Sequence, residues 1–381
     1  MRVRNFIFFM TILLSSSLLL KAQETIQGSI EHDNLTRSYI VYVPAMYDES
    51  IATPLVLNFH GFGSNATQQM WYGDFRTIAD TTGIIVVHPE GTLFQGSGHW
   101  NVGGFTTGST IDDVGFTEEL IDHLSSIYNI DPNRVYSTGM SNGGYMSFLL
   151  ACQLGDKIAA IASVTGSMTP EIYESCDPKH PTPIMQIHGT TDPTVPYMGE
   201  TWTKPISTVL EYWVNFNDCN PTPAIVQLPD LDATDGCTAE NFVYSGGENT
   251  TKVEHYKIHG GLHTWPGSIF GSAGTNKDFN ASKVIWDFFS RYSLDDLTGT
   301  SRWSQNQNKE QAISIYPNPA QNRLNIQKEM EGDIPYEIIS LEGKISQSGV
   351  LNGKDQKVDI SSLPEGIYIL KAGNTRVKFL K

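Results

Sequence analysis

The sequence has 381 residues and a formal net charge of −16, which becomes −19 when Arg2, Arg4 and Lys21 are removed with a leader segment. A chain with this much negative charge is repelled by phosphate, so nucleic acid is disfavoured as a partner. The length suits one large domain followed by a small one.

The first 22 residues have the pattern of a secretory signal peptide. Arg2 and Arg4 precede an apolar run from Phe6 to Leu20, and the small residue Ala22 stands at the expected cleavage point. The run is short for an anchor helix, no cysteine follows it for lipid attachment, and no later stretch is apolar enough to span a bilayer. We therefore expect an exported protein, extracellular or at the cell surface, with no membrane span after signal removal.

Residues 23–294 alternate between strand-like and helix-like segments. The strand-like runs are nearly continuous in apolar residues, as expected of strands buried on both faces. The alternation predicts an α/β fold with a mostly parallel central sheet covered by helices on both sides. The clearest strand-like runs are residues 54–61, 83–91, 134–139, 158–166 and 183–189, and the clearest helices are residues 112–128 and 282–292.

The composition changes after that region. Residues 295–311 are polar and rich in Gln and Asn, which predicts a linker. Residues 312–381 alternate short strands with turns, contain no histidine or cysteine, and predict a small all-β sandwich without catalytic residues.

Four cysteines follow the signal segment, and none forms a CxxC pair, so we expect no metal or redox site. An even number in an exported chain favours disulfides. Of the three possible pairings we favour Cys152 with Cys176 and Cys219 with Cys237, because both enclosed loops are short.

A nucleophile elbow is predicted at Ser141. The stretch from Gly139 to Gly143 matches G-x-S-x-G, follows a strand-like run and opens a helix-like one. The strand and helix at such a turn pass so close that the residues two before and two after the serine must be small. The helix N-terminus also offers unpaired N–H groups to a developing oxyanion.

A serine hydroxyl needs a base and an acid to act as a nucleophile. Asp192 directly follows the apolar run at 183–189, and His263 lies in a Gly-rich loop beyond a later strand. The order serine, acid, histidine, each after its own strand, predicts a catalytic triad. We prefer His263 to His188 and His259, because those two lie at or before strand ends.

Other polar residues have simpler interpretations. Asp112 or Asp113 stands where a helix cap is expected. Asp230, Asp232 and Asp235 depart from the calcium-loop pattern, which favours a plain turn and no bound metal.

Acyl transfer needs a second oxyanion donor. The backbone N–H of Phe62, after the strand that ends in "NFHGFG", is expected to join that of Asn142. Trp100, Asn101 and Trp265 occupy nearby loops and could line an aromatic pocket, although core packing is nearly as good an explanation for each tryptophan.

With these residues assembled, residues 27–292 resemble the secreted polyhydroxybutyrate depolymerase and feruloyl/acetylxylan esterase family of α/β-hydrolases. The matching motifs are "HGFG", "HWN" with "DDVGF", "GMSNGGYMS", "IHGTTDPTVPY" and "HTWPG". The resemblance implies carboxylic-ester hydrolysis without a cofactor and carries Ser141, Asp192 and His263 as the triad. Leu262 replaces a glycine that is usual in the family.

From Ser314 the tail resembles the type IX secretion sorting domain of Bacteroidetes, through "YPNP", "SLPEGIYIL" and the basic end "VKFLK". This implies the type IX secretion machinery as a partner. We thus expect a secreted serine esterase acting on polyhydroxybutyrate-type polyester or on feruloyl or acetyl esters of plant polysaccharide. The alternative is a non-catalytic surface-displayed binding or adhesion protein on a hydrolase fold.

Overall fold

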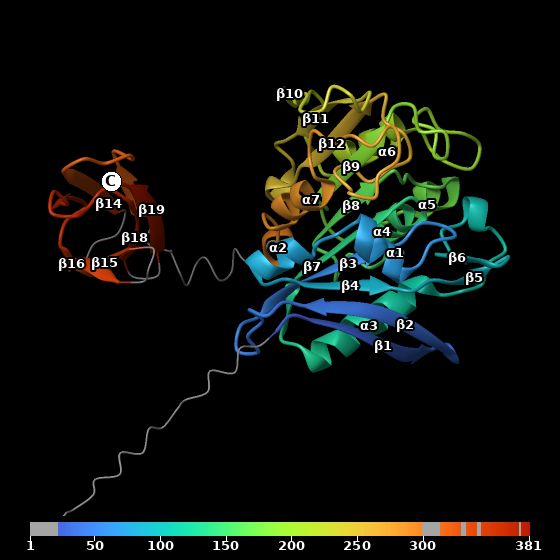
Figure 1. The fold of residues 1–381 in the computed structure, drawn as a ribbon, viewed down its shortest axis with the longest axis horizontal. Coiled ribbons are helices and arrows are strands. Elements are labelled where there is room, and N and C mark those ends of the chain that lie inside the picture. Colours follow the sequence, from blue (N-terminus) through green and yellow to red (C-terminus); the bar gives the residue numbers. More distant parts are fainter. Residues whose placement is uncertain (1–21, 299–312, 329–332, 341–343, 373–374) are drawn as a thin grey trace, which may run out of the picture. The chain divides into compact units, whose positions relative to one another are not determined.

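The computed structural model describes residues 22–298, 313–328, 333–340, 344–372 and 375–381. All but the last residue of the predicted signal peptide and most of the predicted linker lie outside these ranges. The chain divides into two compact units, residues 1–298 and 299–381 (Figure 1).

The first unit is built on a ten-stranded mixed sheet. Its six central strands, β4, β3, β7, β8, β9 and β12, are parallel, and antiparallel strands extend both edges. The strands in sheet order are β1 (Glu24–His32), β2 (Leu35–Val43), β4 (Ile85–Pro89), β3 (Thr53–Phe59), β7 (Ile130–Met140), β8 (Ala160–Val164), β9 (Ile184–Gly189), β12 (Val253–His259), β11 (Thr238–Tyr244) and β10 (Ala224–Gln227). A small hairpin, β5 (Thr92–Phe94) and β6 (Ser97–His99), stands apart from this sheet.

Helices cover both faces of the sheet because alternate side chains of the buried strands point to opposite sides. Leu55 and Leu57 of β3 join one core with residues of α3, α4 and α6, while Val56 joins the other core with residues of α2 and α7. The helices are α1 (Ala66–Tyr72), α2 (Arg76–Thr82), α3 (Asp113–Ile127), α4 (Asn142–Gln153), α5 (Pro170–Ser175), α6 (Ile206–Phe216), α7 (Ala281–Phe289) and α8 (Leu294–Leu297).

The first unit continues to Thr298, a little beyond the start of the predicted linker. The Ser293 side chain caps α8 by accepting from the N–H of Asp296, and Leu294 and Leu297 are buried in the core. This short helix is therefore part of the packed unit. None of the helices in the described ranges is both long and apolar enough to cross a membrane.

The second unit is a small β-sandwich of antiparallel strands, as predicted. One sheet has three strands and the other four, and a core that includes Leu324, Ile338 and Leu370 draws on both. The strands in sheet order are β13 (Ile313–Tyr316), β14 (Arg323–Lys328) and β17 (Asp355–Asp359), then β16 (Ile345–Leu351), β15 (Ile334–Ser340), β18 (Ile367–Ala372) and β19 (Thr375–Leu380). The predicted fold class is confirmed for both parts.

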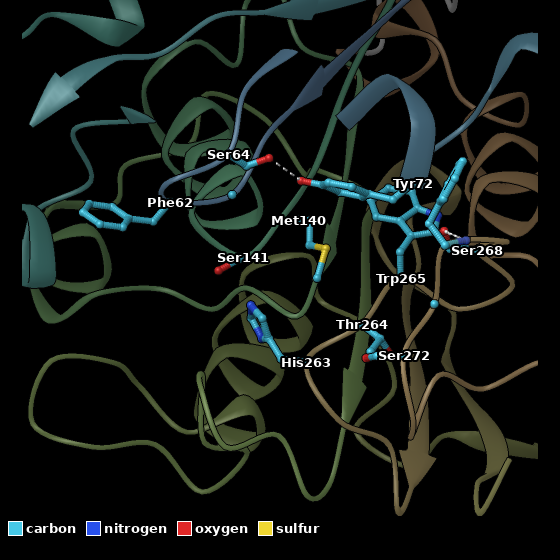
Figure 2. Close-up of a pocket in the computed structure, with 13 residues that line it drawn as sticks. Phe62, Ser64, Tyr72, Met140, Ser141, His263, Thr264, Trp265, Ser268 and Ser272 are labelled. Carbon is cyan, nitrogen blue, oxygen red and sulfur yellow. Dashed lines mark hydrogen bonds between the residues drawn. The ribbon is translucent and has the colours of Figure 1, made fainter. Parts of the chain in front are cut away.

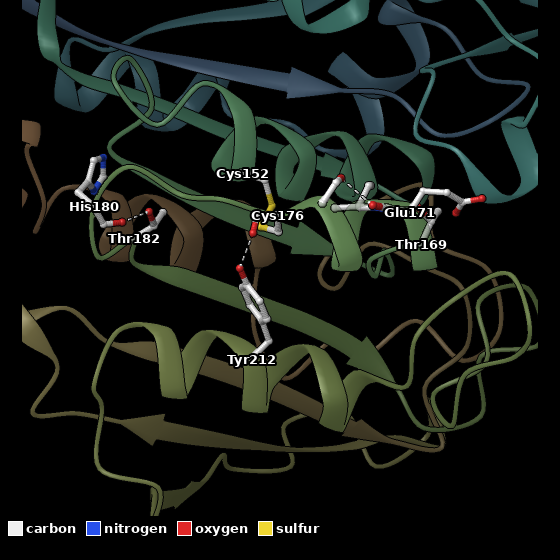
Figure 3. Close-up of a disulfide and its surroundings, with 9 residues drawn as sticks. Cys152, Thr169, Glu171, Cys176, His180, Thr182 and Tyr212 are labelled. Carbon is white, nitrogen blue, oxygen red and sulfur yellow. Dashed lines mark hydrogen bonds between the residues drawn. A yellow bond between two sulfur atoms is a disulfide. The ribbon is translucent and has the colours of Figure 1, made fainter.

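The disulfide predictions divide into one correct pair and one wrong pair. Cys152, near the end of α4, is bonded to Cys176, which follows α5 and whose carbonyl accepts from the Tyr212 hydroxyl (Figure 3). Cys219 and Cys237 are instead free thiols, both buried. Cys219 packs in the core on one face of the sheet and Cys237 in the core on the other, so the sheet separates them.

Candidate active site

Ser141 occupies the sharp turn between β7 and α4. Its φ of 56° and ψ of −121° place a non-glycine residue in a strained conformation, as the elbow predicts. A Cβ added at Gly139 would lie 2.6 Å from the Phe59 carbonyl oxygen, and one added at Gly143 would lie 2.1 Å from it. The predicted need for small residues at both positions is therefore confirmed, and its cause is the backbone of β3.

We predict that Gly143→Ala is strongly destabilising. The obstructing atom is a backbone oxygen in a central strand, so neither partner can move aside cheaply, and we expect a loss of roughly 3 kcal/mol or more in the free energy of unfolding. Denaturant unfolding followed by tryptophan fluorescence measures it. Gly155→Ala is the matched control, because the nearest atom to an added Cβ there lies at 3.4 Å. Equal stability of the two variants would contradict the packing argument.

Asp192 and His263 meet in a direct hydrogen bond. His263 Nδ1–H donates to Asp192 Oδ2 at 2.8 Å, which leaves Nε2 as the acceptor nitrogen. The backbone N–H groups of Thr194 and Val195 donate to Asp192 Oδ1 at 2.8 and 2.9 Å. The carboxylate is thus fixed from both sides with its second oxygen aimed at the imidazole.

Ser141 and His263 line one cavity of about 300 Å³ (Figure 2). The imidazole extends toward Ser141 from the loop after β12, and Tyr72 and Trp265 lie on the far side of Met140. The structure thus brings together the three residues predicted from separate loops. Within the described residues no hydrogen bond joins Ser141 Oγ to His263, so the two side chains share the cavity without direct bonding.

A second histidine, His188, lies behind the acid. Its Nε2–H donates to the Val195 carbonyl at 2.8 Å, and Nε2 lies 3.5 Å from Asp192 Oδ2. Burial lowers the pKa of His188, which keeps this imidazole neutral. Burial alone would raise the pKa of Asp192. The hydrogen bond and charge of His263 lower it, with smaller contributions from His188 and the Val195 N–H. The lowering effects are larger, so the pKa lies below its ordinary value.

The predicted oxyanion donors lie on either side of the serine. Among the described residues, neither the N–H of Phe62 nor that of Asn142 has a hydrogen-bond acceptor. Gly61 passes so close to the nucleophile that a Cβ there would lie 3.3 Å from Ser141 Cβ. Two unpaired N–H groups at this turn are what an oxyanion requires.

Trp100 does not line the cavity. It contacts the loop after β3, which carries Gly61 and Phe62, and stabilises it. It is fully buried, its indole N–H donates to the His60 carbonyl at 2.9 Å, and its backbone N–H donates to Asn142 Oδ1 at 2.7 Å. His60 accepts from the Gly91 N–H at 2.9 Å and donates through Nδ1 to the Gly61 carbonyl at 2.8 Å. The peptide that carries the Phe62 N–H is therefore held by the buried imidazole of His60. This role was not predicted, although the motifs "HGFG" and "HWN" contain His60 and Trp100.

Asn101 is also displaced from its predicted role. Its side chain donates to the Ile111 carbonyl at 2.9 Å and it lines a separate cavity. Trp265 lines the Ser141 cavity as predicted, with its indole N–H donating to Ser282 Oγ at 3.2 Å. The pocket prediction is therefore wrong for Trp100 and Asn101, because the loop after β6 turns both side chains into internal contacts.

The remaining polar candidates have structural roles. Asp112 caps α3, and the buried Asp113 accepts from Arg37 at 2.6 Å. Asp232 pairs with Lys277 in a turn, and His259 pairs with Glu240 at the end of β12.

The parallel sheet and the strained serine turn between β7 and α4 define the α/β-hydrolase fold. An acetyl xylan esterase from Aspergillus awamori has a similar fold. The TM-score is 0.52 at 14% identity, over 70% of this chain and 99% of that one.

Comparisons with known proteins match separate parts of the chain. Residues 109–223 match the phospholipase/carboxylesterase family model, and residues 314–381 match the secretion system C-terminal sorting domain. Feruloyl esterase B from Piromyces equi is 32% identical over 262 residues, which is 68% of this chain and 46% of that protein. The bifunctional acetylxylan esterase/xylanase XynS20E from Neocallimastix patriciarum is 26% identical over 279 residues, which is 73% of this chain and 36% of that protein.

The chain thus spans less than half the length of both relatives. The predicted resemblance to feruloyl and acetylxylan esterases and to a sorting domain is confirmed.

Proposed function

We propose that the chain is a secreted serine esterase that cleaves feruloyl or acetyl esters of plant polysaccharide. The observation that carries the proposal is that His263, hydrogen-bonded to Asp192, lines the same cavity as Ser141. The names of the relatives support the substrate class.

In the proposed mechanism Ser141 Oγ attacks the ester carbonyl carbon while His263 Nε2 takes the hydroxyl proton. The carbonyl oxygen becomes an oxyanion and accepts from the N–H groups of Phe62 and Asn142. His263 then protonates the departing alcohol oxygen, leaving an acyl-enzyme. Water, deprotonated by His263, attacks that ester and releases the acid, and Asp192 holds the imidazole in one tautomer throughout.

The cavity suits a flat acyl group. Aromatic rings and hydroxyl groups share its walls, and rings give offset or edge contacts to a planar acid while hydroxyls bond its substituents. The aromatic members are Tyr72, Trp265 and Phe270, and the hydroxyl members include Ser64, Ser268 and Ser272.

The other side of the serine suits the alcohol part of the ester. Phe62 is 42% exposed and points away from Tyr72 (Figure 2). Its ring lies 6.1 Å from Phe105, which lies 5.4 Å from Trp202. A partly exposed aromatic row beside the nucleophile offers sugar rings a stacking surface, which favours a polysaccharide ester over a linear polyester.

The sorting-domain match supports export through the type IX machinery to the cell surface or the medium. We further propose that residues 1–22 are a signal peptide, 23–294 the esterase domain, 295–311 a linker and 312–381 the sorting domain. The mechanism uses no metal or cofactor, since protein groups supply the nucleophile, base and oxyanion donors.

A substrate panel tests this function. We expect the purified protein to release ferulate from methyl ferulate or acetate from acetylated xylan, with kcat/KM at least about tenfold above that for hydroxybutyrate oligomers, which corresponds to about 1.4 kcal/mol. The measurement is acid release by chromatography. Preference for the oligomers would overturn the substrate class. Failure to react with a fluorophosphonate probe, together with no turnover, would favour the binding or adhesion alternative.

A further inference from the structure

A side-chain cluster joins the hairpin of β1 and β2 to the start of α3. His32 ends β1, Asp33 follows it in the turn, and Asp112 caps α3. His32 Nε2 lies 3.7 Å from Asp33 Oδ2 and 3.7 Å from Asp112 Oδ2. One potential ligand atom from each residue therefore lies within 4.8 Å of the others.

The imidazole at the centre of the cluster is buried and lies near carboxylates without hydrogen-bonding to them. His32 is 7% exposed, and within the described ranges neither ring nitrogen has a hydrogen bond. Buried polar groups are normally hydrogen-bonded, so this ring needs an explanation. Its Nε2 faces two carboxylates that are themselves open to solvent, at 71% and 53% exposure for Asp33 and Asp112.

The other side of the imidazole faces a third carboxylate. Glu119, two turns further along α3, places Oε2 3.1 Å from His32 Nδ1. In metal sites a carboxylate in this position takes the second ring N–H and turns the lone pair of the first nitrogen toward the ion. Here the 3.1 Å contact lacks hydrogen-bond geometry, so Glu119 would accept the Nδ1–H after a small rotation of the ring, with Nε2 turned toward an ion between Asp33 and Asp112.

Gly115 leaves the space for this arrangement. A Cβ there would lie 2.3 Å from Asp112 Oδ2 and 3.0 Å from His32 Cε1. Glycine is disfavoured in helices, yet it stands in the first turn of α3. Asp112 Oδ1 accepts from the Gly115 N–H at 2.8 Å, so the cap uses one oxygen and the other is directed to His32.

We propose that His32, Asp33 and Asp112 bind a divalent transition-metal ion, with zinc as the best match, and that Glu119 orients the imidazole. One imidazole nitrogen with two carboxylate oxygens and room for water suits zinc, whereas calcium takes oxygen ligands alone. The ion would fasten the edge hairpin to α3. None of the four residues lines the Ser141 cavity, so the proposal is independent of the esterase activity.

Calorimetric titration of the chelator-treated, purified protein with zinc chloride tests the site. We expect one zinc ion per chain, and an affinity at least tenfold weaker in Asp112→Asn, because asparagine still caps the helix but supplies no charge. Glu119→Gln should weaken binding by roughly 10- to 100-fold. Asp156→Asn is the matched control, because it removes the same charge from an exposed position outside the cluster.

The midpoint of thermal unfolding supplies a second measurement. Zinc should raise it in the wild type and in Asp156→Asn, by less in Asp112→Asn, and not in His32→Gln. Circular dichroism without metal checks that each variant is folded. If a variant is unfolded, Asp33→Asn, which changes an exposed turn, is used in its place. Unchanged zinc affinity in Asp33→Asn and Asp112→Asn would overturn the proposal. Calcium binding tighter than zinc would overturn it too, and so would the absence of stoichiometric zinc binding.

Discussion

Replacement of Ser141 by alanine should reduce kcat/KM for p-nitrophenyl acetate by roughly 10⁴-fold or more. In the proposed mechanism this hydroxyl forms the acyl-enzyme. Without it, the N–H groups of Phe62 and Asn142 could stabilise only the slow direct attack of water on the ester. Stopped-flow or steady-state release of p-nitrophenol measures the change. The variant should also lose all labelling by a fluorophosphonate probe.

The fold is expected to survive that substitution. Alanine and serine meet the same backbone strain at φ 56°, so the unfolding midpoint should stay near that of the wild type. Ser126→Ala, on an exposed position of α3, is the matched control and should keep full activity. Wild-type turnover by a folded Ser141→Ala protein would refute the nucleophile assignment.

Replacement of Asp192 by asparagine should reduce kcat by about 10⁴-fold while leaving the loop intact. An asparagine oxygen can still accept from Thr194 and Val195, but its amide would donate to His263 Nδ1 and put the proton on Nε2. That tautomer cannot take the proton of Ser141, as expected from triads in general. Steady-state kinetics and the chemical shifts of the imidazole nitrogens measure the two effects.

Asp48→Asn provides the control. Like Asp192, Asp48 accepts from the backbone N–H two residues ahead, here that of Ser50, but it lies in an exposed turn outside the cavity. It should leave kcat unchanged. If Asp192→Asn kept more than about a tenth of wild-type kcat, another group would have to orient His263, and His188 would be the first to examine by substitution.

The convergence of the three proposed triad residues could be predicted from sequence because parallel strands end at one edge of a sheet. Ser141, Asp192 and His263 each follow a different strand, so their order along the chain carries spatial information. The elbow glycines could also be predicted. Any side chain at position 139 or 143 would collide with nearby backbone, so the residue type itself reports the close approach.

The contacts of Trp100 and His60 that hold the loop carrying Phe62 could not be predicted in this way. The contact between the Trp100 indole and the His60 carbonyl depends on which way one loop turns over a sheet edge, and a tryptophan in a loop suits a pocket wall equally well. The pairing of Cys219 with Cys237 failed for a related reason. Sequence separation measures the length of a loop but not whether a sheet lies between its ends.

The two unpaired thiols have a consequence for how the protein matures. In an oxidising compartment any exposed thiolate exchanges with a neighbouring disulfide, so the Cys152–Cys176 bond is open to attack until Cys219 and Cys237 are covered. Their protection is the completed sheet itself, which puts each thiol into a separate core. The native disulfide pattern therefore depends on whether the sheet forms faster than the thiols exchange. If folding were slow, we would expect some chains to carry non-native disulfides.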